Sequence, residues 1–251
     1  MDKEKSFLIN RFKELANISF NKDIYTFTDF LNLNEISILK SIENELPPVK
    51  MTLSGGNLYA ERKIACFNPV DINYEQDFPI SVIKISPLSR KFTDKLTHRD
   101  YLGALLNLGL DRTKIGDIFV LDLDAYIYVI DDLASYIAEN LTRVKHTNVK
   151  CVLCEKLTID IKPNLKEITG NVASVRLDSL ISTAFGSSRN SIIPLISGAK
   201  VFVNGKLITS NGYELKPADI VSVRGKGRFI FNKILGTSKK GRYIVSISLF
   251  F

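Results

Sequence analysis

Tryptophan is absent from this chain of 251 residues, and histidine, methionine and cysteine occur only two, two and three times. Three cysteines cannot pair fully, so a disulfide framework is not expected. No apolar run approaches the roughly 18 residues that a membrane-spanning helix needs. The charged amino-terminal stretch lacks the apolar segment and cleavage site of a secretion signal. These absences predict a cytoplasmic protein.

Acidic residues are missing near the end of the chain. Residues 222–242, SVRGKGRFIFNKILGTSKKGR, contain seven Lys or Arg and no Asp or Glu. Residues 172–251 hold 12 Lys or Arg against 3 Asp or Glu, a balance of +9, whereas residues 1–171 hold 22 against 24, a balance of −2. This asymmetry predicts a polyanionic partner, either nucleic acid or a membrane surface. The alternative, lysines that protect an edge strand, explains one or two bases rather than seven.

The first part of the chain predicts two helices and a hairpin. Apolar residues recur on one face of residues 2–16, and residues 34–44 predict a second helix that ends before two prolines. Residues 49–55 and 61–67 flank a Gly-Gly-Asn turn, which is a β-hairpin signal. Turn-rich residues follow. We therefore expect an amino-terminal α/β domain over residues 1–75, in a chain that is α+β as a whole.

Residues 76–162 show the order of a split βαβ domain. Strands are predicted at residues 80–85, 117–121, 125–130 and 148–154, and helices begin at Thr97 and at Asp131. The order β-α-β-β-α-β is that of ferredoxin-like domains, which RNA-recognition domains share with many unrelated proteins. Tyr126 and Tyr128 would share a face of one strand, either to stack on bases or, as we favour, to pack in the sheet.

Cys151 and Cys154 form a Cys-x-x-Cys sequence that invites a zinc or redox interpretation. No second cysteine pair exists, and the two histidines do not complete a standard zinc spacing. A strand over residues 148–154 would place the two thiols on opposite faces of the sheet. We therefore expect buried strand cysteines, no metal site and no cofactor.

The last third predicts a linker and then a separate domain. Residues 163–171 are expected to be the linker, and residues 172–251 the domain. A helix over residues 176–185 ends at Gly186, and a second helix starts at Ser187 or Ser188 and closes at Gly198. Pro194 lies inside the second helix and would kink it or confine it to its first turns. An Asn-Gly turn and further strands follow.

These elements resemble the S-four RNA-binding domain, which is named after small-subunit ribosomal protein four. Its pattern is two short helices, a V-x-V-N-G turn and a G-D-x-I sequence that leads into a strand. Ala218 stands where the pattern usually has Gly, which leaves the backbone of that turn an open point. The matching residues are Arg176, Leu177, Asp178, Ser188, Arg189, Val201, Val203, Asn204, Gly205, Asp219 and Ile220.

Physical chemistry supports an RNA contact at these helices. A helix N-terminus offers N–H groups and a partial positive charge to a phosphate, and Ser188 and Arg189 stand at such an end. For Arg189 alone, a surface ion pair is the alternative. Lys226 and Arg228 would share a face if their segment is extended. The residues expected to bind RNA are Arg176, Ser188, Arg189, Lys200, Lys206, Arg224, Lys226, Arg228, Lys239, Lys240 and Arg242.

Nearly the whole chain resembles the bacterial YlmH family. The resemblance is carried by THRDYLGALLNLGLDRTKIGDI at residues 97–118, SVRLDSLI at 174–181, SVRGKGRF at 222–229 and TSKKGR at 237–242. It implies an amino-terminal domain, a central RNA-recognition-like domain and a carboxy-terminal S-four domain. It also implies binding to ribosomal RNA on the large subunit that carries a stalled peptidyl-tRNA, in the quality control that adds alanine tails. A link to cell division is implied as well.

The segment that opens the first central helix allows two interpretations. His98, Arg99 and Asp100 match a kinase catalytic loop in letters only, because the other kinase motifs are missing. Arg99 and Asp100 are expected to pack against or cap the helix. The alternative is a second RNA contact formed by Arg99, Arg112 and Lys114.

An RNA-modifying enzyme is the competing function class. S-four domains are often attached to pseudouridine synthases and methyltransferases, and Arg176-Leu177-Asp178 resembles the catalytic-Asp motif of the synthases. No synthase-sized domain follows it, and no Gly-rich loop after a strand supports a methyltransferase. A membrane-surface role lacks an amphipathic basic helix. We therefore expect a monomeric, non-catalytic protein that binds ribosomal RNA, the large ribosomal subunit and peptidyl-tRNA.

Overall fold

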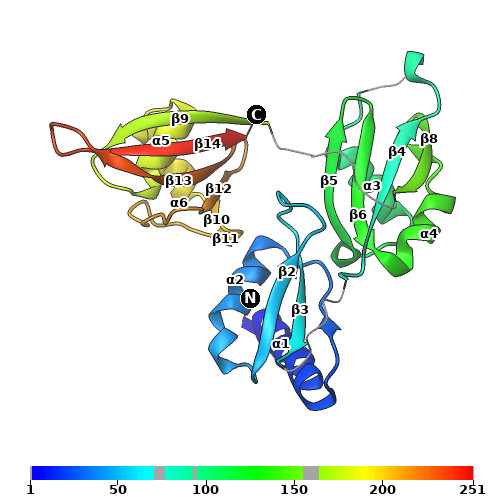
Figure 1. Ribbon diagram of the computed structural model, residues 1–251. Helices are drawn as coiled ribbons and strands as arrows, with labels where there is room; N and C mark the ends of the chain where they lie inside the picture. Colours follow the sequence, from blue (N-terminus) through cyan, green and yellow to red (C-terminus); the bar gives the residue numbers. More distant parts are fainter. Residues whose placement is uncertain (1, 71–76, 93–94, 155–163, 251) are drawn as a thin grey trace. The chain divides into compact units, whose positions relative to one another are not determined.

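The computed structural model describes residues 2–70, 77–92, 95–154 and 164–250. The chain forms two compact units, residues 1–161 and residues 162–251 (Figure 1). The predicted α+β class is confirmed. The predicted boundaries at residues 75 and 162 lie outside the described residues, and the division into three domains stays a prediction. In the described part of the chain, no helix has the length and apolarity to cross a bilayer.

The amino-terminal part of the first unit packs two helices on a small antiparallel sheet of order β1-β3-β2. Asn32 and Glu35 form a capping box that starts the second helix. The core is centred on Phe12, Leu39 and Phe67. The elements are α1 (Asp2–Lys22), β1 (Thr26–Phe27), α2 (Leu33–Ser41), the 3-10 turn η1 (Glu43–Glu45), β2 (Val49–Ser54) and β3 (Ile64–Pro69).

The central part of the first unit is an antiparallel sheet of order β5-β6-β4-β8-β7. The first strand of the β-α-β-β-α-β sequence, β4, lies between β6 and β8, so the predicted ferredoxin-like arrangement is confirmed. The short strand β7 is an addition at the edge. The elements are β4 (Ile80–Pro87), η2 (Arg90–Phe92), α3 (His98–Asn107), η3 (Arg112–Lys114), β5 (Ile115–Leu121), β6 (Asp124–Ile130), α4 (Asp131–Asn140), β7 (Arg143–Val144) and β8 (Thr147–Cys154).

The two faces of the central sheet are buried by different partners. One face packs on α3 and α4, where Ile83 and Ile127 meet Leu105 and Ile137. On the other face, Tyr128 is buried in one cluster with Phe30 and Ile64 of the amino-terminal part. The sheet face that RNA-recognition domains use for RNA is therefore covered, at least around Tyr128, by residues of the amino-terminal part.

Arg62 fastens the amino-terminal part to the central sheet. Its guanidinium donates to the backbone oxygens of Phe30 at 2.7 Å, Ile115 at 3.0 Å and Arg112 at 3.2 Å. Burial lowers the pKa of Arg62, although the carboxylates of Glu35 and Asp117 partly oppose this effect. Hydrogen bonds to three separate carbonyl groups satisfy this half-buried cation.

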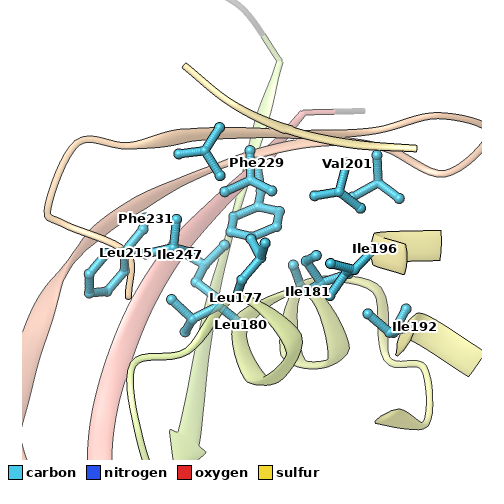
Figure 2. Close-up of a cluster of buried hydrophobic side chains, with 14 of the residues drawn as sticks. Leu177, Leu180, Ile181, Ile192, Ile196, Val201, Leu215, Phe229, Phe231 and Ile247 are labelled. Atoms are coloured by element: carbon cyan, nitrogen blue, oxygen red, sulfur yellow. The ribbon is translucent and has the colours of Figure 1, made fainter. Parts of the chain in front are cut away.

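In the second unit, two helices cover one face of a sheet of order β11-β10-β12-β13-β14-β9. Figure 2 shows Leu177, Ile181 and Ile192 of the helices directed toward Phe229 and Ile247 of the sheet. The elements are β9 (Leu165–Val172), α5 (Leu177–Phe185), α6 (Arg189–Ser197), β10 (Val201–Val203), β11 (Lys206–Leu207), β12 (Ile220–Val223), β13 (Gly227–Thr237) and β14 (Tyr243–Phe250).

The helix boundaries agree with the sequence. Gly186 ends α5 in a left-handed conformation with φ of 58°, and Ser188 is the N-cap of α6. Pro194 does not confine α6 to its first turns, because the helix continues to Ser197. The Asn-Gly turn is also confirmed, with positive φ at both Asn204 and Gly205.

The predicted linker over residues 163–171 is wrong. Leu165–Val172 forms β9, an edge strand that pairs with β14 along its whole length. The inward face of β9 carries Ile168, Gly170 and Val172. Polar residues alternate with them on the outer face, so the segment looked like a linker in the sequence. Gly170 is needed because a Cβ there would lie 2.3 Å from a methyl carbon of Thr183 in α5.

Asn204 and Asp219, two residues of the S-four pattern, hold two turns of the sheet together by hydrogen bonds. The Asn204 amide donates to Asp219 Oδ1 at 2.7 Å, and Asn204 Oδ1 accepts from the Ile220 N–H at 2.9 Å. Asp219 Oδ2 accepts from the Lys216 N–H at 2.7 Å. These bonds join the β10–β11 turn to the start of β12, so both side chains are structural.

Ala218 adopts the left-handed conformation that Gly prefers, with φ of 71°. The backbone of this turn therefore has the expected form despite the alanine, at a cost of about 1 kcal/mol. We predict that Ala218→Gly raises the free energy of unfolding by about 0.5–1 kcal/mol in urea titrations. Ala184→Gly, at a buried position with ordinary helical conformation in α5, is the control and should lower it by at least about 1 kcal/mol. Equal effects of both changes would contradict this assignment of strain.

Gly116 tests the packing of the amino-terminal part on the central sheet. A Cβ at Gly116 would lie 2.7 Å from a ring carbon of Phe30 and 3.0 Å from the Tyr128 Cβ. We predict that Gly116→Ala destabilises the first unit by about 1–3 kcal/mol, measured by thermal unfolding. The control is Gly103→Ala in α3, where a Cβ would meet nothing within 4 Å and should be neutral or stabilising. If Gly116→Ala left the thermal stability of the first unit unchanged, the close packing of Phe30 on Gly116 would be contradicted.

Candidate RNA interface

A connected group of polar and basic residues lies around α5, α6 and the β12–β13 turn, and we call it the helix-turn patch. All its members are exposed to solvent. They are Arg176, Ser188, Arg189, Lys200 and Lys226.

Asp178 and Ser179 link the two helix N-termini of the patch. Asp178 Oδ1 lies 3.4 Å from Arg176 Nε and accepts the Ser179 N–H at 2.9 Å. The Arg189 guanidinium donates to Ser179 Oγ. Asp178 is only 5% exposed. This aspartate therefore positions the arginines, and its contacts are those of a structural residue of the binding domain.

Lys226 connects the β12–β13 turn to the α5–α6 turn. Its Nζ donates to Ser187 Oγ at 3.2 Å, beside the start of α6. Gly227 has φ of 123°, a backbone conformation that other residues rarely adopt, so this tight turn depends on glycine. Lys226 and Arg228 were expected to share a face if their segment was extended, and that condition is not met because residues 224–226 form a turn.

Arginine–aromatic contacts lie next to this turn. The Arg224 N–H donates to the Lys200 oxygen at 2.9 Å, and its guanidinium lies 4.9 Å from the Phe202 ring centroid. The Arg228 guanidinium lies 4.3 Å from the Phe250 ring centroid. Phe202, Arg228 and Phe250 alternate with buried neighbours, so they belong to the sheet face opposite the helices.

Ser188 leaves the start of α6 open. As N-cap it makes no side-chain hydrogen bond to the first helical N–H groups, and its hydroxyl donates to Ser191 Oγ at 3.4 Å instead. The α6 N-terminus therefore combines a positive dipole end with Arg189 and Lys226 beside it. A phosphate group suits that arrangement.

The remaining predicted positions lie away from the patch. Lys239, Lys240 and Arg242 occupy the turn between β13 and β14, at the other end of β13 from Lys226. Lys206 lies on the edge strand β11. The structure thus separates the basic residues of the sequence into the patch, the outer sheet face, the sheet edge and the hairpin turn.

The three residues of the predicted second RNA contact, Arg99, Arg112 and Lys114, lie in two different environments. Arg112 donates to the oxygens of Ile115 and Gly116, and burial lowers its pKa to about 10. Lys114 Nζ lies 2.7 Å from Asp29 Oδ1. Both therefore have contacts at the joint between the amino-terminal part and the sheet. Arg99 is exposed and lines a cavity of about 470 Å³ with Arg143 and Lys145. The use of Arg99, Arg112 and Lys114 in RNA binding stays a prediction.

The expected sheet packing of the central tyrosines is confirmed, and base stacking by them is not compatible with the structure. Tyr126 is 5% exposed and Tyr128 is 0% exposed. The Asn57 amide donates to the Tyr128 hydroxyl at 3.3 Å. Cys151 and Cys154 lie on β8 on opposite faces, as expected, but both are only partly buried rather than buried. Burial raises the pKa of the Cys151 thiol to about 11.

Comparisons with known proteins agree with this architecture. Residues 74–157 match the family model described as "Putative RNA-binding domain in YlmH", and residues 175–221 match the "S4 domain". The chain is 32% identical to the ribosome-associated protein quality control protein P2 of Bacillus subtilis, over 87% of this chain and 85% of that protein. The chain belongs to the YlmH family.

Two further similarities concern parts of the chain. The small ribosomal subunit protein uS4 of Hahella chejuensis is 39% identical over 54 residues, which are 21% of this chain and 26% of that protein. A solved structure, the cell division protein ylmH from Streptococcus pneumoniae, matches with a TM-score of 0.50 and 22% identity. The match covers 60% of this chain and 91% of that structure, and at this identity the similarity supports the fold alone.

Some interface residues were not predictable from their own pattern. Asp178 belonged to the S-four pattern, but its link to both arginines through Ser179 depends on the packing of α5 against α6. Phe202 and Phe250 beneath the arginines depend on strand register, which two bulges in β13 obscure. A periodicity of two around Phe202 was the available signal for its outward face.

Asp100 confirms the expected capping role and gives a pH test. It accepts from the Thr97 N–H at 2.8 Å and lies 2.8 Å from Lys145 Nζ, and the lysine and threonine contacts lower its pKa to about 2. A lowered folded-state pKa stabilises the protein above the ordinary value of 3.8, and this stabilisation is lost as pH falls toward 2.

We therefore predict that Asp100→Asn lowers the Tm at neutral pH and that the difference from the wild type shrinks between pH 4 and about pH 2. Thermal melts followed by circular dichroism across this range check it. A Tm difference that is independent of pH would contradict the role of the charged carboxylate.

Proposed function

We propose that this YlmH-family protein binds the large ribosomal subunit and peptidyl-tRNA, without catalysing a reaction, in the rescue or quality control of stalled translation. The observation that carries the proposal is the helix-turn patch, where an open helix N-terminus is flanked by Arg189 and Lys226. The printed name of the Bacillus subtilis relative supports the ribosomal setting. The protein would act as a monomer in the cytoplasm.

The patch suits the backbone of an RNA helix rather than a base sequence. Its cations stand at two helix N-termini, just after α6 and in the β12–β13 turn, so the folded core of the domain sets their backbone positions. Double-stranded RNA is recognised mostly by shape and by phosphate contacts. Affinity that rests on such contacts falls steeply with salt.

A charge reversal within the patch tests the proposal. We predict that the double variant Lys200→Glu with Lys226→Glu weakens binding to purified large subunits by at least about tenfold at moderate salt. Its log–log salt slope should also be shallower. Co-sedimentation and fluorescence anisotropy over a salt series provide the measurements.

The matched control is Lys166→Glu with Lys216→Glu, which changes the net charge equally, in the same domain, at exposed positions outside the patch. It should bind within about twofold of the wild type. If both variants lost affinity for large subunits equally, binding would depend on net charge rather than on the patch, and the proposal would be contradicted. A change in nucleoside mass after incubation with ribosomal RNA would contradict the non-catalytic role.

A further inference from the structure

The far end of the β13–β14 hairpin forms a second distinct surface, residues 233–243, which we call the hairpin end. Core packing of these strands stops at Phe231 and Val245. Beyond them, Ile234 is 44%, Leu235 51% and Tyr243 39% exposed. In Figure 1, the connection between β13 and β14 projects beyond the two helices of its own domain. The exposed cations here are Lys233, Lys239, Lys240 and Arg242.

The hairpin end is held in one conformation by its own hydrogen bonds. The Ser238 N–H donates to the Arg242 oxygen at 2.7 Å, and Ser238 Oγ accepts from the Arg242 N–H at 3.1 Å. The Arg242 guanidinium donates to the Asn171 oxygen of β9 at 3.2 Å. Gly241 supplies the positive φ of 71° that the turn needs. Such order lowers the entropy that binding would cost.

This surface is electrostatically separate from the helix-turn patch. Lys226 precedes β13 and Lys239 follows it, and β13 has 11 residues. Even a bent strand of that length separates its ends by roughly 30 Å. The Debye length at physiological salt is about 8 Å. The two basic groups therefore cannot serve one phosphate cluster, and each needs its own stretch of ligand.

The composition of the hairpin end points to unpaired nucleotides. Residues 220–251 contain no Asp or Glu, so no carboxylate of the hairpin's own segment neutralises the four cations. Tyr243 has the same strand parity as Val245 and Ile247, which places it on the helix-bearing face beside Val172, where the core ends. An aromatic ring among phosphate-binding cations is the usual platform for a splayed base. A paired helix, in contrast, hides its base faces.

We infer that the hairpin end binds unpaired RNA nucleotides. A base stacks on Tyr243, and Lys239, Lys240 and Arg242 contact the neighbouring phosphates. The helix-turn patch meanwhile holds a separate, paired stretch. This inference rests on the proposed function for the class of ligand, and it adds that the S-four domain bridges two RNA elements of different structure.

Two RNA probes separate the surfaces: a short single-stranded oligouridine and a fully paired RNA hairpin of mixed sequence. Tyr243→Leu keeps an apolar side chain at the position paired with Val172 but removes the stacking ring. We predict that it weakens oligouridine binding by about tenfold and changes binding of the paired hairpin by less than about twofold. Tyr243→Phe retains a ring and should bind both probes as the wild type does. Fluorescence anisotropy on the full chain measures all four affinities.

The patch variant Lys200→Glu with Lys226→Glu is the reciprocal control and should lose mainly the paired probe. If Tyr243→Leu binds oligouridine as tightly as the wild type, the inference is overturned while the proposed function stands. Equal losses on both probes would also overturn it. If the patch variant binds both probes normally while Tyr243→Leu loses oligouridine binding, the assignment of paired RNA to the helix-turn patch is contradicted. Loss of subunit binding with unchanged oligouridine binding would assign the hairpin end to a protein partner and overturn the inference.

Discussion

The S-four domain depends on how α5 and α6 are fixed to the sheet. Leu177, Ile181 and Ile192 bury the helices against Phe229 and Ile247, which sets the position of both helix N-termini (Figure 2). Once that core forms, the α5–α6 turn meets the β12–β13 turn, and the basic residues at both turns come together without any direct attraction between them. Hydrophobic burial thus supplies the free energy that holds like charges close to each other.

In the first unit, the chain covers a sheet face that the same fold leaves open for RNA in other proteins. Its ferredoxin-like sheet presents a face that related architectures use for RNA, but Phe30 and Ile64 bury Tyr128 there. Arg62 locks this arrangement with bonds to three carbonyl groups. A nucleic-acid contact by this unit must therefore use another surface, such as the exposed region around Arg99. The fold class alone would have assigned the wrong face.

The sequence predicted most elements because their signals were local. Gly186 and the Asn204-Gly205 turn need particular backbone conformations, and such residues mark boundaries directly. Strand β9 was missed because its polar outer face masked the inward alternation around Ile168. The placement of Lys226 apart from Arg228 was missed because two glycines turn the chain between strands. The burial of Tyr128 could not be predicted from the sequence, because it depends on packing against Phe30, which lies about 100 residues earlier in the chain.

Site-specific photo-crosslinking tests the central claim most directly. A photoreactive amino acid at position 187, beside the Lys226 contact, would be irradiated in the presence of large ribosomal subunits, and the crosslinked RNA would be sequenced. We predict one dominant RNA crosslink, located in or next to a paired helix and reduced at higher salt. Absence of an RNA crosslink from position 187, together with strong RNA crosslinks from an exposed control position such as 216, would contradict the assignment of the helix-turn patch as the RNA interface.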